Sequence, residues 1–368
     1  MRRLHASIEG ELVEAFTRVL ASGRYHLGAE TALLEEEFAD HEGADFGICC
    51  GSGSDALYLA LRALDVGPGD AVVTVPNTFV ATAESIARTG ATVLFAEPSS
   101  TSHTLDPEDL VRLLREPGGE SVRAVVPVHL YGRRADIQGI HQALQQAGRP
   151  EIAVVGDAAQ AHGSPGVGGE TDLTAYSFYP SKNLGALGDG GIVLCRDPEA
   201  AERIRRLRNH GREGKHHSAE LGLNSRFDEV QAATLRIKLR YLRTWNRQRR
   251  ALAARYCEML AGTPGLTLPS DSAGHVYHLF VVEVLGSAPM RDRVAETLRR
   301  EGVGAGLHYP VPLHHMKPYP SHRPLPISEG LCERVLSLPL FPGLRDEEME
   351  RVVSVLKGSL ESHARGTP

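Results

Sequence analysis

Between residues 46 and 157, short apolar runs alternate with stretches of helical periodicity. The runs at 46–50, 71–75, 92–95, 123–129 and 152–156 have the length and composition of buried strands, and a candidate helix follows each of the first four. Strands that alternate with helices form a parallel sheet with helices on both faces. Ligands of such sheets bind beyond the carboxyl ends of the strands. The sequence therefore predicts an α/β fold with its functional site at that edge of the sheet.

The remainder of the chain predicts a smaller unit after the sheet. A long helical pattern rich in arginine and lysine runs over 227–260, and the composition changes after Gly265. Residues 278–284 alternate like an edge strand, and helices are expected at 290–300 and 347–356. We expect a large cofactor-binding α/β domain over residues 1–245 and a small C-terminal α+β domain over residues 246–368.

Composition argues against several classes of protein. The 368 residues carry a net charge of -6, whereas a nucleic-acid-binding protein needs a basic surface. No apolar run approaches the ~20 residues of a membrane helix. The first ten residues lack the apolar core of a secretory signal, and the five cysteines include no CxxC pair. We expect a cytoplasmic protein that binds neither membrane nor nucleic acid.

One turn and three single residues are predicted to gather at the carboxyl edge of the sheet. The turn Gly51–Asp55 lies between a strand and a helix, where free backbone N–H groups bind anions. Phe79 follows the strand at 71–75, Asp157 follows the strand at 152–156, and His129 is expected at the same edge. Each also has an ordinary interpretation, as a helix cap or as part of the core.

Lys182 is the candidate catalytic residue, between a run rich in aromatic and hydroxyl side chains and a glycine-rich run. Burial lowers the pKa of a lysine, and its neutral amine can then bond covalently to a carbonyl. A cofactor with an aldehyde, a pyridine ring and a phosphate is pyridoxal 5'-phosphate. It would bind its aldehyde to Lys182, its ring nitrogen to Asp157, its ring face to Phe79, and its phosphate to Gly53, Ser54, Asp55 and Ser177.

Seven motifs in order resemble those of the DegT/DnrJ/EryC1/StrS family of sugar aminotransferases, which are fold type I enzymes that use this cofactor. The resemblance covers nearly the whole chain. The fold that it implies is a large domain with a mostly parallel sheet flanked by helices, plus a smaller C-terminal α+β domain. The motifs are Gly51–Leu57, Pro76–Thr82, Pro127–Gly132, Asp157–Gly163, Ser177–Gly185, Gly188–Gly191 and Leu223–Gln231.

The resemblance implies a role for each matching residue. Lys182 would hold the cofactor and move the proton, Asp157 would pair with the ring nitrogen, and Gln160 would lie near the ring hydroxyl. Ser177 and the turn Gly53–Asp55 match phosphate contacts, and Phe79 matches the aromatic residue that stacks on the ring. Asn224 matches an asparagine that reaches the phosphate from the partner subunit. The resemblance therefore implies a homodimer with shared active sites.

The reaction implied moves an amino group from L-glutamate to a nucleotide-linked keto-sugar. The amino-acid sequences at 73–82 and 129–132 most resemble those of members that aminate C3 of a 3-keto-sugar. Members that act on a 4-keto-sugar, a 3-keto-uronate or a keto-cyclitol are the alternatives. Ser54 replaces a threonine common in the family and keeps the hydroxyl. Lys182 is a lysine, whereas the dehydratases among the relatives have histidine there.

The residues that recognise the sugar are harder to assign. The candidates are Tyr25, His308, Tyr309, His314 and His315. A metal site at these histidines is the rival interpretation, and we expect none because prolines interrupt the segment and no acidic residue is close in sequence. The alternative from another class is a regulatory DNA-binding protein that uses residues 203–215 and the long basic helix.

Overall fold

The large sheet has seven strands in the order β1-β7-β6-β5-β4-β2-β3. The computed structural model describes residues 2–365. Strand β7 runs antiparallel to both its neighbours, and the other four pairings are parallel. The predicted α/β class with a mostly parallel sheet is confirmed. The strands are β1 (Phe46–Cys50), β2 (Ala71–Thr74), β3 (Thr92–Phe95), β4 (Val122–Val125), β5 (Ala153–Asp157), β6 (Leu173–Ser177) and β7 (Gly191–Cys195).

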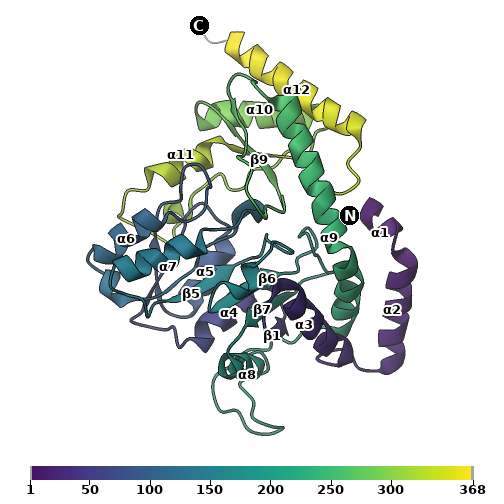
Figure 1. Ribbon diagram of the computed structural model, residues 1–368, viewed down its shortest axis with the longest axis vertical. Coiled ribbons are helices and arrows are strands. Elements are labelled where there is room, and N and C mark those ends of the chain that lie inside the picture. The colour runs from purple at the N-terminus through teal and green to yellow at the C-terminus, as the bar shows by residue number, and fades with distance from the viewer. Residues whose placement is uncertain (1, 366–368) are drawn as a thin grey trace.

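Helices cover both faces of this sheet (Figure 1). Side chains of a strand alternate between the two faces, so Val72 of β2 packs in one core cluster and Val73 in another. Since both faces are buried, the strands are almost continuously apolar, which is why they were recognisable in the sequence. The helices are α3 (Ala29–Glu42), α4 (Gly53–Ala63), α5 (Val80–Arg88), α6 (Pro107–Arg115), α7 (Ile137–Gln146) and α8 (Pro198–Leu207).

A second sheet, in the order β10-β9-β8, lies in the C-terminal part. The prediction that residues 278–284 form an edge strand was wrong, because β9 lies between β8 and β10 and pairs with both. Strand β10 had not been predicted. The elements are β8 (Leu266–Thr267), β9 (Phe280–Val284), α10 (Ala288–Arg300), α11 (Pro326–Arg334), β10 (Val335–Leu338) and α12 (Asp346–Arg365).

Helix α9 (Glu229–Leu260) runs from the large sheet to the small one (Figure 1). The domain boundary proposed after residue 245 falls inside this continuous helix. Two N-terminal helices, α1 (Arg2–Ala6) and α2 (Glu9–Ser22), lie beside α9, and α2 packs Ala15 and Val19 against it. The short 3-10 turns are η1 (Gly119–Ser121), η2 (Leu130–Gly132), η3 (Val167–Gly169) and η4 (Leu313–His315).

Several of the basic residues of α9 pair with acidic side chains or are buried within the chain. Arg236 pairs with Glu30 and Glu37, and Arg240 pairs with Glu11. Lys238 and Arg249 are buried. Arg243, Arg247 and Arg250 are exposed, so only part of the basic pattern of this helix is solvated. Among the residues that the structure describes, no helix is both long enough and apolar enough to cross a membrane.

Candidate active site

The turn after β1 leads directly into the N-terminus of α4. The Ser52 hydroxyl accepts a hydrogen bond from the N–H of Asp55 at 3.1 Å, and the Ser52 carbonyl accepts one from Ala56. The N–H groups of Gly53 and Ser54 are therefore the ones left for an anion at the positive end of the helix. A Cβ at Gly53 would lie 2.5 Å from Ser177 Cβ, so only glycine lets α4 approach the end of β6 this closely.

Lys182 lies in the turn between β6 and β7, where its N–H bonds to Tyr179 O at 2.9 Å. The turn is compact, since a Cβ at Gly185 would lie 2.3 Å from Pro180 O. The lysine side chain reaches a cavity but is enclosed by protein on most sides. Burial lowers the pKa of Lys182 to about 8, and the charge of Asp157 opposes this shift. A substantial fraction of the amine is therefore neutral near pH 8.

Asp157 ends β5 and is only 5% exposed. Burial raises the pKa of its carboxyl, whereas hydrogen bonds from the Thr82 hydroxyl and the Ala159 N–H and the charge of Lys182 oppose the shift. The Thr82 hydroxyl lies 2.8 Å from Oδ2, and the Ala159 N–H lies 3.1 Å from Oδ1. The carboxylate is thus oriented by two donors and needs a cationic partner in the cavity.

One cavity of about 450 Å³ brings together most of the predicted site. Phe79, half exposed, borders it with Tyr309, and the two rings lie 5.8 Å apart at 38°. Gln160 accepts a bond from the Tyr131 N–H and donates one to the Tyr309 hydroxyl at 3.2 Å. The predicted residues that line this cavity are Gly53, Ser54, Phe79, Asp157, Gln160, Ser177, Lys182, His308 and Tyr309.

Other predicted residues lie elsewhere in this chain. His129 lies at the predicted edge of the sheet, where its N–H bonds to Asp157 O at 3.0 Å, but it is fully buried, its Nδ1 accepts a bond from the Ala135 N–H at 3.1 Å, and it does not line the cavity. The Asp55 carboxylate turns toward Ser225 and Arg88 rather than the cavity. Tyr25, His314, His315 and Asn224 do not line the cavity either, and Tyr25, His315 and Asn224 are exposed.

Thr82 and His278 are cavity residues that the sequence reasoning missed. Thr82 follows Phe79 by one helical turn, and that spacing could have placed both beside the same ligand. His278 precedes β9, and no sequence signal pointed from there to the large sheet. Burial and the nearby charge of Lys182 lower the pKa of His278 well below its usual value, so its imidazole is neutral.

A second cavity of about 620 Å³ shares Lys182, His278 and His308 with the first. Lys238 and Arg249, both from α9, line it. Lys238 Nζ donates to Gly185 O at 2.5 Å, and Arg249 donates to three backbone carbonyls. All of these acceptors are backbone oxygens, not carboxylates. Burial lowers the pKa of Lys238 to about 8 and that of Arg249 to about 10. No acidic side chain lines this cavity within residues 2–365.

The cavity combines a lysine of lowered pKa, an oriented carboxylate and a helix N-terminus with free N–H groups that can bind an anion. This combination is typical of an aminotransferase active site. The model of the DegT/DnrJ/EryC1/StrS aminotransferase family matches residues 6–357, so the chain belongs to this family.

Two curated relatives match almost end to end. The chain is 41% identical to the dTDP-3-amino-3,4,6-trideoxy-alpha-D-glucose transaminase of Streptomyces venezuelae, covering 97% of this chain and 94% of that protein. It is 39% identical to the UDP-N-acetyl-3-dehydro-alpha-D-glucosamine 3-aminotransferase of Acidithiobacillus ferrooxidans, covering 98% and 96%. The chain is therefore similar over its whole length to transaminases of nucleotide sugars.

Solved structures agree with this assignment. The crystal structure of S. venezuelae DesV in complex with a ketimine intermediate is 40% identical, with a TM-score of 0.89, and the match covers 98% of this chain and 97% of that one. The structure of NtdA from Bacillus subtilis with bound cofactor PMP is 28% identical, with a TM-score of 0.89, covering 96% and 82%. The fold is that of these aminotransferases.

Proposed function

We propose that this protein is a pyridoxal 5'-phosphate-dependent aminotransferase that moves an amino group from L-glutamate to C3 of a nucleotide-linked keto-sugar. The observation that carries the proposal is the pairing of Lys182, whose pKa is lowered to about 8, with the buried carboxylate of Asp157 in one cavity. When bound, the cofactor supplies an electron sink that makes a proton on the neighbouring substrate carbon acidic.

The residues present fit this cofactor. The phosphate would lie at the N–H groups of Gly53 and Ser54 and the hydroxyl of Ser177, at the positive end of α4. The ring nitrogen would face Asp157, whose buried charge otherwise lacks a full partner. Phe79 would cover the ring, and its half-exposed position beside the cavity leaves it free to do so. Lys182 would hold the aldehyde carbon.

The chain's own groups then do three things. Lys182 Nζ, neutral in part near pH 8, accepts the substrate proton and returns it, as a general base and acid. Asp157, held by Thr82 and the Ala159 N–H, would keep a proton on the ring nitrogen of the bound cofactor. The remaining wall, from Gln160 and Tyr309, orients the ring and reduces the access of water to the reacting atoms.

L-Glutamate is proposed as donor because the second cavity, next to Lys182, is lined among the described residues by cationic and not by acidic side chains. Lys238 and Arg249 line the cavity on the other side of Lys182, and a dicarboxylate would offset two buried positive charges that lack acidic partners among the described lining.

The acceptor is proposed from the relatives. Both curated relatives described above have names that place their amino group at C3 of a nucleotide sugar, one linked to dTDP and one to UDP. With about 40% of residues identical over nearly the whole chain, the position of amination is more readily shared than the nucleotide or the other sugar substituents.

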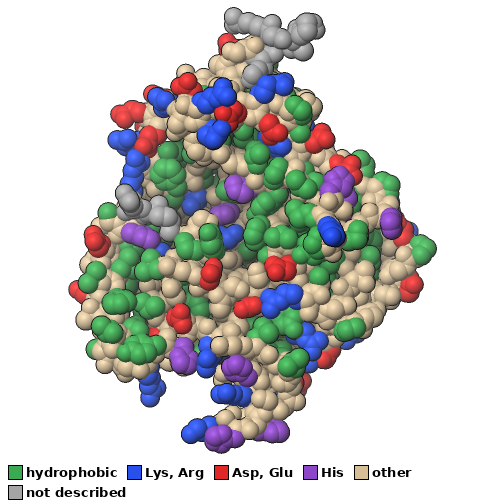
Figure 2. Space-filling model, turned by 180° about the vertical axis from the view of Figure 1, so that it is seen from behind, with side chains coloured by type: hydrophobic (Ala, Val, Ile, Leu, Met, Phe, Trp, Pro, Cys, Tyr) green, Lys and Arg blue, Asp and Glu red, His purple; other side chains and the backbone are tan. Residues whose placement is uncertain are grey.

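We propose a homodimer in which each site takes Asn224 from the partner. Asn224 is exposed and does not line the cavity of its own chain, so its amide is available to another subunit. It belongs to the loop between α8 and α9, which projects from the large sheet and carries basic and histidine side chains at its tip (Figures 1 and 2). All five cysteines are free, which is compatible with the reducing cytoplasm proposed as its location.

The test follows the two halves of the reaction separately. Purified protein loaded with the cofactor should absorb visible light, and L-glutamate should bleach it. A nucleotide-linked 3-keto-sugar should then restore the absorbance and yield a 3-amino-sugar by mass spectrometry. A 4-keto-sugar, a 3-keto-uronate and a keto-cyclitol run in parallel identify the acceptor, and we expect kcat/KM to be highest for the 3-keto-sugar.

Two results would contradict this proposal. Protein that binds no cofactor but shifts DNA at moderate salt would favour the regulatory function instead. Bleaching by glutamate followed by recovery with only a 4-keto-sugar would retain the aminotransferase and reject amination at C3.

A further inference from the structure

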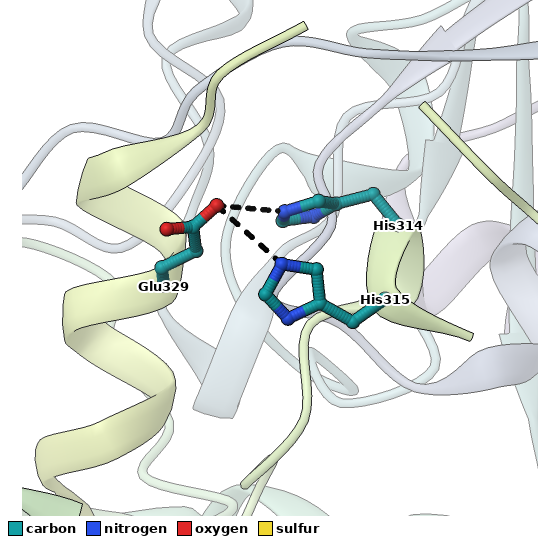
Figure 3. A group of neighbouring side chains, drawn as sticks. All are labelled: His314, His315 and Glu329. Atoms are coloured by element: carbon teal, nitrogen blue, oxygen red, sulfur yellow. Dashed lines mark hydrogen bonds and ion pairs between the residues drawn. The ribbon is translucent and has the colours of Figure 1, made fainter. Parts of the chain in front are cut away.

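Two adjacent imidazoles and one carboxylate converge between η4 and α11. The Nε2 atoms of His314 and His315 lie 3.1 and 3.5 Å from the same oxygen, Oε1 of Glu329. Figure 3 shows both rings pointing toward Glu329 from the turn that carries them. One candidate ligand atom from each residue lies within 4.8 Å of the other two. The sequence predicted no metal here because no acidic residue was close, but folding supplies Glu329 from the next helix.

These separations suit a zinc ion. Zinc binds imidazole nitrogen and carboxylate oxygen at about 2.0–2.2 Å in a tetrahedron, whose edges are then roughly 3.3–3.5 Å. The two nitrogen–oxygen distances are already close to such edges. Two imidazoles with one carboxylate favour a transition metal ion over Mg²⁺ or Ca²⁺, which prefer oxygen ligands alone.

The backbone on the histidine side is held in place. The N–H of Leu313 bonds to Pro76 O at 2.8 Å, and the Leu313 side chain is fully buried. His314 is 7% exposed, its ring packs near Phe95, and its Nδ1 is buried with no hydrogen-bond partner among the described residues. No bond at Nδ1 therefore competes with the orientation that directs Nε2 to Glu329.

The backbone on the glutamate side is also held. The carboxylate of Glu97, 6% exposed, accepts bonds from the N–H groups of Ile327 and Ser328 and from the Ser328 hydroxyl. These bonds anchor the first turn of α11, on which Glu329 lies. Ligands on fixed backbone lose little conformational entropy when an ion binds.

We propose that His314 Nε2, His315 Nε2 and Glu329 Oε1 form a zinc site, with water as the fourth ligand. His315 and Glu329 are open to solvent, which gives the ion a route of entry and leaves room for that water. None of the three residues lines the cavity of Lys182. The site is structural: the ion joins η4 to α11 and takes no part in amino transfer.

The test is a zinc titration of the cofactor-loaded protein after treatment with a chelator, measured by calorimetry without any amino donor. We expect one site per chain with a Kd of about 1 µM or tighter. His315→Ala and Glu329→Gln should each weaken binding at least tenfold, and both positions are accessible enough to change without opening the core. His216→Ala/His217→Ala, in another exposed histidine pair, is the matched control and should bind as the unchanged protein does.

Thermal unfolding gives a second readout that is independent of catalysis. Zinc should raise the Tm of the unchanged protein and of the control, but not that of Glu329→Gln, because only an ion bound to the folded state stabilises it. Equal zinc affinity in the control, His315→Ala and Glu329→Gln would overturn the proposal, as would tighter binding of Mg²⁺ than of Zn²⁺. The cofactor spectrum reports separately on the aminotransferase site, so the two proposals can fail independently.

Discussion

The side chain of Lys182 has one carboxylate to offset its burial, and burial has the larger effect on its pKa. Among the described residues that line the first cavity, only Lys182 has an amine that can bond to the cofactor aldehyde. Lys182→Ala should therefore abolish turnover and the visible absorbance of the lysine-bound cofactor. Lys317→Ala, at an exposed lysine outside the cavity, is the control and should retain both. Activity retained in Lys182→Ala, measured by amino-sugar formation, would exclude its assigned role.

The lowered pKa of Lys182 also predicts how cofactor binding depends on pH. Below about pH 8 the amine is mostly protonated and unreactive, and above it the amine is mostly neutral. The rate at which cofactor-free protein gains visible absorbance on adding the cofactor should rise from pH 7 to pH 9 with a midpoint near 8. Stopped-flow absorbance measures this rate. A midpoint near the ordinary lysine value of 10.5 would show that burial does not activate the amine.

Asp157 and Thr82 should act together, since the threonine hydroxyl orients the carboxylate. Asp157→Asn retains the shape but not the charge, and should lower kcat by about 10²-fold or more while the cofactor still binds. Thr82→Val should lower kcat by roughly tenfold, the effect of losing one hydrogen bond to a charged group. In an Asp157→Asn background, Thr82→Val should cost much less, because the charge it orients is gone. Additive losses in the double variant would mean that Thr82 acts on something else.

Residues that follow a strand directly could be placed at the site from the sequence. Asp157 ends β5, Ser177 ends β6, and Gly53 opens the helix after β1, so topology alone brings them to one edge. His278 and Tyr309 could not be placed in this way, because they reach the cavity through contacts between distant parts of the chain. The direction of the Asp55 carboxylate was equally inaccessible, since Ser225, far along the chain, determines it.

At the scale of elements, periodicity and apolar runs predicted the long helices and the strands that are buried on both faces of the sheet. Helix α9 was predicted to within two residues at its start, and β1 and β3 at their observed bounds. Strand β10 was missed because its four residues continue directly from α11, with no turn residue to mark the change. Strand β9 resembles an edge strand in the sequence because its residues alternate, yet it pairs on both sides. The pairing partner of a strand is a property of the fold, which local sequence does not encode.

Helix α9 carries the next prediction. Lys238 and Arg249 lie about three turns apart and so face the same cavity. Lys238→Met removes one buried positive charge and should raise KM for L-glutamate by roughly tenfold or more, as expected for a lost bond to a carboxylate. KM for the keto-sugar and the visible spectrum should change little. Lys238→Arg, which keeps the charge, should restore much of the donor affinity.

Steady-state kinetics with each substrate varied in turn measures this effect. An equal rise in both KM values, or a changed spectrum, would instead indicate that Lys238 only supports the turn that carries Lys182, through its bond to Gly185 O.

At the scale of the whole molecule, one chain provides the cavity but keeps Asn224 outside it. In the proposed homodimer each site combines Lys182 of one subunit with Asn224 of the other. Asn224→Ala should therefore lose its cofactor in dialysis, and its activity with it, although the residue does not line the cavity of its own chain. This consequence distinguishes a shared site from two independent ones.

Mixing two inactive variants tests the sharing directly. When Lys182→Ala and Asn224→Ala chains are unfolded together and refolded, half of the dimers are mixed, and each mixed dimer has one site with both residues intact. Activity should recover to about a quarter of that of the unchanged protein. If Asn224 served its own chain, every site in the mixture would lack one of the two residues, and no activity beyond that of the separate variants would return. Refolding each variant alone provides the baseline, and size-exclusion chromatography confirms that dimers have formed.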